Sequence, residues 1–205
     1  IGRLLPGFSD EFNDGDLAGW AWVREPVGGY SLRGERLVFP TQAADLFEGS
    51  NNASVLTRPL PAGNIVVETR VKLDLPPEGC CFNFVQAGLV VYDDDDNYIK
   101  LTHVSIFETR QTEFAKELFP VPDGYPRYGN TVVGPPGDWT YLRITRRQAG
   151  GEELYTAYTS QNGRDWVRGG VWTHTLGNDA RIGLVSMGGA GFTAEFDYVH
   201  VFRLH

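Results

Sequence analysis

Cysteine is almost absent from this sequence. The 205 residues include two cysteines, Cys80 and Cys81, which are adjacent. Neighbouring cysteines cannot close a loop, so the sequence predicts no disulfide framework and favours two free thiols over a strained bridge. No apolar run approaches the roughly 20 residues of a membrane helix. Because no disulfide framework is expected, the fold must depend on its hydrophobic core. A chain of this length can bury roughly 70% of the surface that its unfolded form exposes.

Basic residues are also scarce. Lysine and arginine number 18 against 26 acidic residues, which gives a formal net charge of -8. A nucleic-acid surface needs a basic stripe, so that class of partner is excluded, whereas a neutral partner fits. The sequence also lacks a glycine-rich phosphate loop, a Gly-x-Ser-x-Gly elbow and any metal-ligand spacing among its four histidines. The paired-carboxylate strand of sandwich-type retaining glucanases is missing too.

Turn formers and aromatic residues are abundant instead. The chain has 25 glycines and 12 prolines, and 13% of its residues are aromatic. Alternation of apolar and polar residues, as over 64–73, is common, while the best helical window, 112–118, allows one or two turns at most. We expect about twelve short strands with long loops at 76–84 and 118–137. The sequence thus predicts one all-β domain over residues 1–205, a two-sheet antiparallel sandwich. No membrane partner is expected.

Two groups of polar residues are candidates for a binding site. Segment 41–53 is rich in amide and carboxylate groups, which match sugar hydroxyls in pairs, although the same residues also form turns. Gln86 and Lys100 share one face of neighbouring predicted strands, and Glu113, Lys116 and Glu117 follow on the next segment. This face could be the floor of a polar groove or the solvated side of a sheet.

A carboxylate near the end of the chain suggests a metal ion. Asp197 shares its parity with Val199 and Val201, and a carboxylate on an apolar face must be paired or bound to a metal. A structural Ca²⁺ held by Glu11 and Asp197 would join the two terminal strands. The alternative places Asp197 at a sheet edge, where it meets water or an arginine.

Two further motifs are interpreted as turns rather than as binding sites. The acidic run Asp93–Asp96 lacks the spacing of an EF-hand and is expected to be a solvated hairpin tip. The segment Ser160–Trp166 resembles a short Asp-box with one residue missing, and is expected to cap a hairpin with Trp166 packed over the turn.

The order of several segments resembles a known family. These segments are Asp10–Phe12, Trp22–Glu25, Thr41–Leu46, Asn51–Ala53, Gln86–Tyr92, Asp96–Leu101, Lys116–Glu117, Ser160–Trp166 and Phe196–Tyr198. Together they resemble the concanavalin A-like domain at the C-terminus of family 43 β-xylosidases, and the related accessory domains of secreted glycoside hydrolases. The resemblance implies a jelly roll, an extracellular or cell-envelope location and a covalently linked catalytic domain. Several relatives bind xylan, and the propeller that carries their catalytic acids has no counterpart in these residues.

The main hypothesis is a non-catalytic carbohydrate-binding module for a plant-type polysaccharide such as xylan or arabinoxylan. We expect stacking on exposed rings and hydrogen bonds from polar groups, and the predicted binding residues are Trp22, Arg24, Gln42, Asp45, Asn51, Asn52, Gln86, Tyr92, Lys100, Glu117, Trp139 and Trp172. Replacing Trp22 or Asn52 with alanine should weaken binding without unfolding the domain.

Two alternatives stay open. A small glycoside hydrolase or lyase would use loop acids such as Glu48, Glu117 or Asp45, and requires a carboxylate pair facing a pocket, one with a raised pKa. A module that only packs on a catalytic domain requires a contiguous apolar patch on one sheet face.

Overall fold

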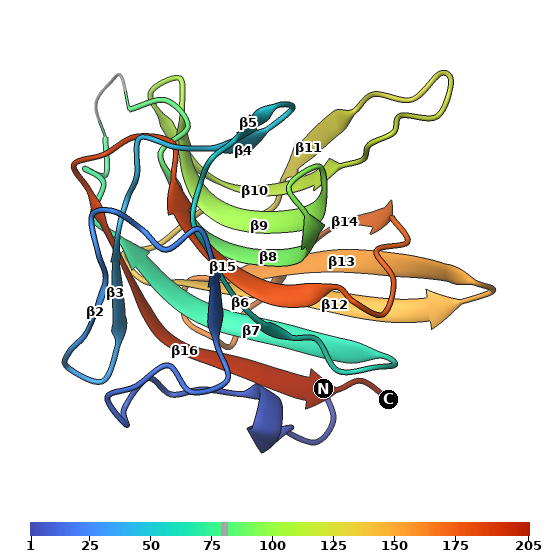
Figure 1. Ribbon diagram of the computed structural model, residues 1–205, viewed down its shortest axis with the longest axis horizontal. Coiled ribbons are helices and arrows are strands. Elements are labelled where there is room, and N and C mark those ends of the chain that lie inside the picture. Colours follow the sequence, from blue (N-terminus) through green and yellow to red (C-terminus); the bar gives the residue numbers. More distant parts are fainter. Residues whose placement is uncertain (79–81) are drawn as a thin grey trace.

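Two seven-stranded antiparallel sheets make up the fold (Figure 1). The computed structural model describes residues 1–78 and 82–205, so the predicted thiols of Cys80 and Cys81 lie outside the described residues. The first sheet has the order β1 (Ala21–Val23), β6 (Val55–Pro59), β15 (Arg181–Met187), β8 (Gln86–Asp94), β9 (Asn97–Ile106), β10 (Thr109–Glu117), β11 (Tyr128–Val132). The second has the order β14 (Val167–Thr173), β13 (Glu152–Ser160), β12 (Thr140–Ala149), β7 (Ile65–Leu73), β16 (Thr193–Arg203), β3 (Leu37–Pro40), β2 (Ser31–Leu32).

The remaining elements are small. One 3₁₀ turn, Pro6–Phe8, lies near the N-terminus, and a hairpin of β4 (Leu46–Phe47) and β5 (Ser50–Asn51) lies above β8 and β9 (Figure 1). No helix in the described ranges is long and apolar enough to cross a membrane. The all-β, two-sheet sandwich expected from the alternation is confirmed.

The core lies between the sheets, and the strands supply it by alternation. Leu89 and Val91 of β8 join Ile99 and Leu101 of β9 in the main hydrophobic cluster. The residues that alternate with these core residues therefore point away from the core, to the outer face of the first sheet. This outer face carries the candidate site.

Two expectations about strands and loops were wrong. Residues 112–117 of the helical window lie in strand β10, because pairing with β9 and β11 on both sides outweighs a weak local preference. The loop expected at 118–137 contains β11, whose residues Tyr128–Val132 pair with β10.

A bulge in β16 overturns the parity argument for Asp197. Phe196 pairs with Val71 and Val199 with Thr69, so β16 has one extra residue between these pairs. Phe196 and Val199 consequently both face the core, while Asp197 pairs with Arg70 at 3.0 Å and Arg36 at 3.6 Å. The carboxylate thus meets arginines, as the alternative reading expected.

The acidic hairpin tip is tied down rather than simply solvated. Asp95 accepts two hydrogen bonds from Arg24 at 2.7 and 2.8 Å. Asp96 accepts from Arg127 and Asn51, both at 2.7 Å. Cations that are distant in sequence thus reduce the mutual repulsion of the run, which local spacing could not reveal.

The turn at Ser160–Trp166 is confirmed as a hairpin cap. The Ser160 hydroxyl accepts from the backbone amides of Asn162 and Gly163. Trp166 donates to the Gly163 carbonyl at 3.3 Å and its ring contacts Tyr141, so the indole packs over the turn.

A buried histidine should make the stability of the domain depend on pH. The side chain of His103 is 5% exposed, and burial lowers its pKa from 6.5 to about 4. Its contribution is complete above pH 6.5 and is lost as pH falls toward 4, because the unfolded state then binds the proton more tightly. We expect wild type to lose about 3 kcal/mol more than His103→Gln across this window, measured by urea unfolding. Parallel curves for the two proteins would contradict this.

Candidate functional site

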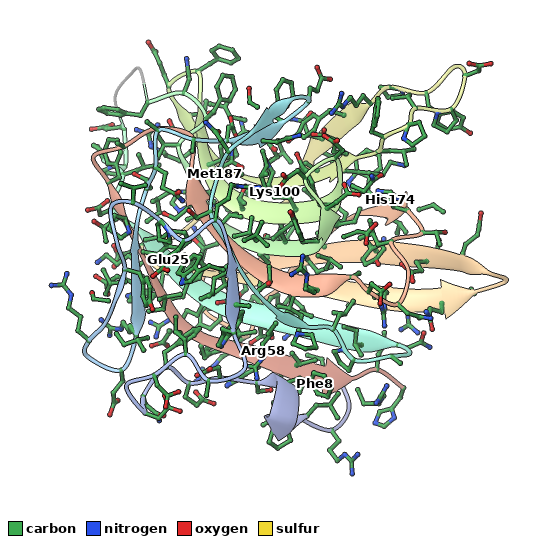
Figure 2. The ribbon with its side chains drawn as sticks, viewed as in Figure 1. Phe8, Glu25, Arg58, Lys100, His174 and Met187 are labelled. Carbon is green, nitrogen blue, oxygen red and sulfur yellow. The ribbon has the colours of Figure 1, made fainter. Side chains whose placement is uncertain are left out.

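A second hydrophobic cluster covers part of the outer face of the first sheet. Leu46 of the β4–β5 hairpin is fully buried there and belongs to a cluster with Val90, Tyr98, Val185 and Met187. The hydroxyl of Tyr98 donates to the Leu46 carbonyl at 2.7 Å, which fixes the hairpin to the sheet. The uncovered part of this face lies over β9, β10 and β11, where Lys100 is labelled in Figure 2.

A cavity of about 260 Å³ opens on this uncovered part. Strands β8 to β11, the β4–β5 hairpin and the segment before β8 supply its lining, which comprises Asp45, Phe47, Phe84, Gln86, Lys100, Glu113, Tyr128 and Asn130. Strand register explains the floor, because Lys100 lies opposite Ala115, and Ala115 lies opposite Asn130. The sheet thus brings polar side chains from distant segments onto one face.

The floor of the cavity is built on a buried ion pair. Lys100 is 2% exposed, and its Nζ lies 3.5 Å from Oε1 of Glu113. The Tyr128 hydroxyl donates to the same oxygen, and Asn130 Nδ2 donates to Oε2 at 3.4 Å. Burial raises the pKa of Tyr128, and the adjacent Glu113 carboxylate raises it further, so the phenol stays a donor. These contacts hold the Glu113 carboxylate in one orientation.

Asp45 places a second carboxylate at the cavity. Its Oδ1 accepts from the Leu46 amide at 2.8 Å. Burial raises the pKa of Asp45, while Lys100 and the Leu46 amide lower it and Glu113 raises it. Two carboxylates and one ammonium group therefore share one cavity.

Aromatic rings form the walls of the cavity. Phe47 is 44% exposed and meets Tyr128 edge-on, with ring centroids 4.9 Å apart. Phe84 is 45% exposed and lies on the rim from the segment before β8. Exposed rings beside fixed polar groups can contact both the C–H face and the hydroxyls of a sugar.

An open hollow of about 620 Å³ adjoins the cavity and shares Asp45 with it. Asn51, Asn52 and the backbone at Gly188 and Gly189 contribute to its lining. The Asn52 side chain accepts from the Asp45 amide at 3.0 Å, so the hollow also positions Asp45. The predicted residues Asp45, Asn51, Asn52, Gln86 and Lys100 are thus brought into two neighbouring depressions.

Other predicted binding residues adjoin the site but have structural contacts. Gln42 bonds the backbone of Ser186 and Ser54. Tyr92 donates to Asp95, the same carboxylate that pairs with Arg24. These side chains hold the segments around the hairpin in place.

Glu117 and Glu48 also lie outside the cavity lining. The Glu117 side chain is completely buried. It accepts from Arg127 and the Glu48 amide, and it shares the single hydroxyl proton of Tyr98 with the Leu46 carbonyl. Of the three acids named for catalysis, Asp45 alone lines the cavity.

The three predicted tryptophans lie elsewhere. Trp22 packs on the main core, with its ring 5.1 Å from that of Phe39. Arg36 and Arg70 lie over the Trp139 ring at 4.9 and 4.4 Å. Trp172 packs on Phe114 and donates to the Phe114 carbonyl. The expectation that Trp22→Ala would spare the fold is therefore not supported by its packing.

Four lining residues were not singled out from the sequence: Phe47, Phe84, Tyr128 and Asn130. The last two belong to β11, in the stretch expected to be a loop. The β-favouring residues Tyr128, Thr131 and Val132 are the signal that could have identified this strand.

The predicted calcium ligands already have partners. Glu11 contacts His200 at 2.6 Å, and Asp197 pairs with arginines. Within the described residues, no cluster of three or more His, Cys, Asp or Glu side chains could hold a metal ion. Calcium at Glu11 and Asp197 stays a prediction. Its expected result is a Tm that is lower in EDTA than with Ca²⁺, and an equal Tm in scanning calorimetry would contradict it.

Comparisons with known proteins place this geometry in a family. The sequence family described as the β-xylosidase C-terminal concanavalin A-like domain matches residues 9–201, whereas no curated protein matches the chain. A mutant of the GH43 protein BlXynB from Bacillus licheniformis superposes with a TM-score of 0.77 at 16% identity, covering 100% of this chain and 40% of that one. GH43B of a Bacteroides ovatus xyloglucan locus gives 0.70 at 20% identity, covering 96% and 39%.

A lumenal domain that was solved with a bound glycan shares the fold more distantly. The lumenal domain of VIP36, in its form with Ca²⁺ and Man3GlcNAc, superposes with a TM-score of 0.59 at 12% identity, covering 99% of this chain and 91% of that one. The chain spans about 40% of the length of the GH43 proteins it matches. Because the family match covers nearly the whole sequence, the chain belongs to the β-xylosidase C-terminal concanavalin A-like domains.

Proposed function

We propose that this domain binds a neutral plant-type polysaccharide in the Lys100 cavity and acts as a non-catalytic accessory module beside a GH43 catalytic domain. One observation carries the proposal: the cavity combines exposed phenylalanines with planar polar groups fixed by hydrogen bonds. Xylan or arabinoxylan is the first ligand to test, since the family takes its description from β-xylosidases. A role beside a polysaccharide-degrading enzyme implies an extracellular or cell-envelope location.

The charge of the cavity supports a neutral ligand. Asp45, Glu113 and Lys100 give it a net negative formal charge, and Lys100 already pairs with Glu113. Sugar hydroxyls can both donate and accept, so they suit a site that offers both kinds of group. Affinity should be modest because a polar site must release well-bonded water.

Affinity electrophoresis against xylans, arabinans, β-glucans and mannans tests the proposal. Retardation by one polysaccharide, without release of reducing sugar, is the expected result. A domain that no glycan retards would overturn binding and leave packing on a catalytic domain as its role.

Phe47→Ala should weaken binding about tenfold, because the cavity loses an exposed ring that a sugar face can contact. Titration calorimetry with the retarding polysaccharide measures the change. Tyr125→Ala is the matched control, since Tyr125 is 64% exposed and does not line the cavity. Equal losses in both variants would place the site elsewhere.

A second candidate, glycoside hydrolysis, has one observation in its favour: Asp45, with its raised pKa, faces the same cavity as Glu113. Binding is better supported, because Lys100, Tyr128 and Asn130 engage both oxygens of Glu113. Reducing sugar released by wild type but not by Asp45→Asn would favour the enzyme instead.

A further inference from the structure

We infer that the Lys100 cavity accepts one terminal sugar residue, from a chain end or a branch, and excludes the interior of a polysaccharide chain. This inference rests on the proposed function and specifies the class of ligand. It follows from how the outer face of the first sheet is closed, from the size of the cavity and from its charge.

The β4–β5 hairpin closes one side of the outer face. Leu46 fills the space above Val90, Tyr98 and Val185, so the face over β8 and β15 is covered by packed side chains. A polysaccharide chain that entered over β11 would meet this packed cluster beyond Lys100. The face is therefore a blind site rather than a groove that runs across the sheet.

Charged contacts hold the closure in place. Arg127 donates to Glu117 at 3.1 Å and to Asp96 at 2.7 Å, and Asp96 also accepts from Asn51 of β5. Tyr98 bonds both Leu46 and Glu117, which joins the hairpin to the floor of the sheet. Displacing the hairpin to admit a chain interior would break these bonds together and expose a buried carboxylate, so we expect it to stay closed.

The size of the cavity matches one ring. Its volume of about 260 Å³ lies below the roughly 300–1,000 Å³ of sites for drug-sized ligands. The next residue of the chain must leave by the same opening through which the terminal residue entered, and so makes fewer contacts with the lining. One sugar residue should therefore contribute most of the affinity.

The charges define which terminal residue can enter. A terminal uronate would bring its carboxylate beside Asp45 and Glu113, while the nearby ammonium group of Lys100 is already paired. Like charges in a desolvated site repel strongly. The occupant is therefore a neutral pentose or hexose residue.

A ladder of oligosaccharides with one to six residues, made from whichever polysaccharide retards the domain, tests this inference by titration calorimetry. We expect the affinity to level off by two residues, and the methyl glycoside of the same sugar to compete with the hexamer. Two results together would overturn the terminal-residue site but leave the proposed function standing: affinity that still rises at five or six residues, and a methyl glycoside that does not compete with the hexamer. Failure of every glycan to bind would instead overturn the proposed function.

Asn130→Ala provides a second readout. Asn130 lines the cavity, so the variant should lower the affinity for the methyl glycoside and the affinity for the hexamer by the same factor. A loss that grows with chain length would show that Asn130 contacts a chain interior, and would contradict the inference. The Tm of the variant confirms that it is folded.

Discussion

Lys100→Met should weaken polysaccharide binding between tenfold and a hundredfold. Lys100 is 2% exposed on the cavity floor and orients Glu113 through the contact at 3.5 Å. Hydrogen bonds to charged groups contribute about 1.5–3 kcal/mol, and about 1.4 kcal/mol corresponds to a tenfold change in affinity. Methionine keeps most of the length of the lysine side chain, so the variant removes charge with little change in volume. Titration calorimetry with the retarding glycan measures the loss.

Lys116→Met is the matched control for this variant. Lys116 lies three positions after Glu113 in β10. It nevertheless donates to the Thr173 carbonyl and lies over the Trp172 ring, away from the cavity. Its binding constant should stay within twofold of wild type. Because Lys100→Met leaves a buried carboxylate without its cation, the Tm of both variants must be measured alongside. A folded Lys100→Met protein with wild-type affinity would remove the cavity from the proposed site.

The sequence predicted the fold class well, because the pattern that defines it is local. Alternation along 64–73 corresponds to strand β7, and the pairing of Gln86 and Lys100 on one face follows from the same period. A tight turn with strong signals, as at Ser160–Trp166, was also predictable. These features depend on residues that are close together in the chain.

The rest of the site depends on contacts between distant segments. The extra residue in β16 reversed the direction of Asp197, and a bulge of this kind leaves no clear local signal. Composition does not distinguish exposed aromatics from core aromatics: Trp22 packs on the core, whereas Phe47 lines the cavity. The spacing of the acidic run reveals only its own charges, because the arginines that pair with it lie 31 and 71 positions away. Only the folded arrangement supplies those partners.

Arg127→Met should be strongly destabilising, lowering the free energy of unfolding by about 3–5 kcal/mol. Glu117 is completely buried, and its ion pair with Arg127 at 3.1 Å supplies the positive charge beside it. Removing the arginine leaves a buried carboxylate with neutral donors from Tyr98 and the Glu48 amide. In a domain of this size the change corresponds to a Tm about 10 °C lower, measured by scanning calorimetry.

Two further variants separate the buried charge from other effects. Arg24→Met breaks a bidentate pair with Asp95, but those side chains are 35% and 26% exposed, so it should cost about 1 kcal/mol or less. The double variant Glu117→Gln with Arg127→Met should recover part of the loss, because the uncompensated charge is gone. If the double variant were as unstable as the sum of the single changes, the ion pair would not be what holds the β4–β5 hairpin over the sheet. Partial recovery would show that the buried charge of Glu117 depends on Arg127, which is what a closing role for this ion pair requires.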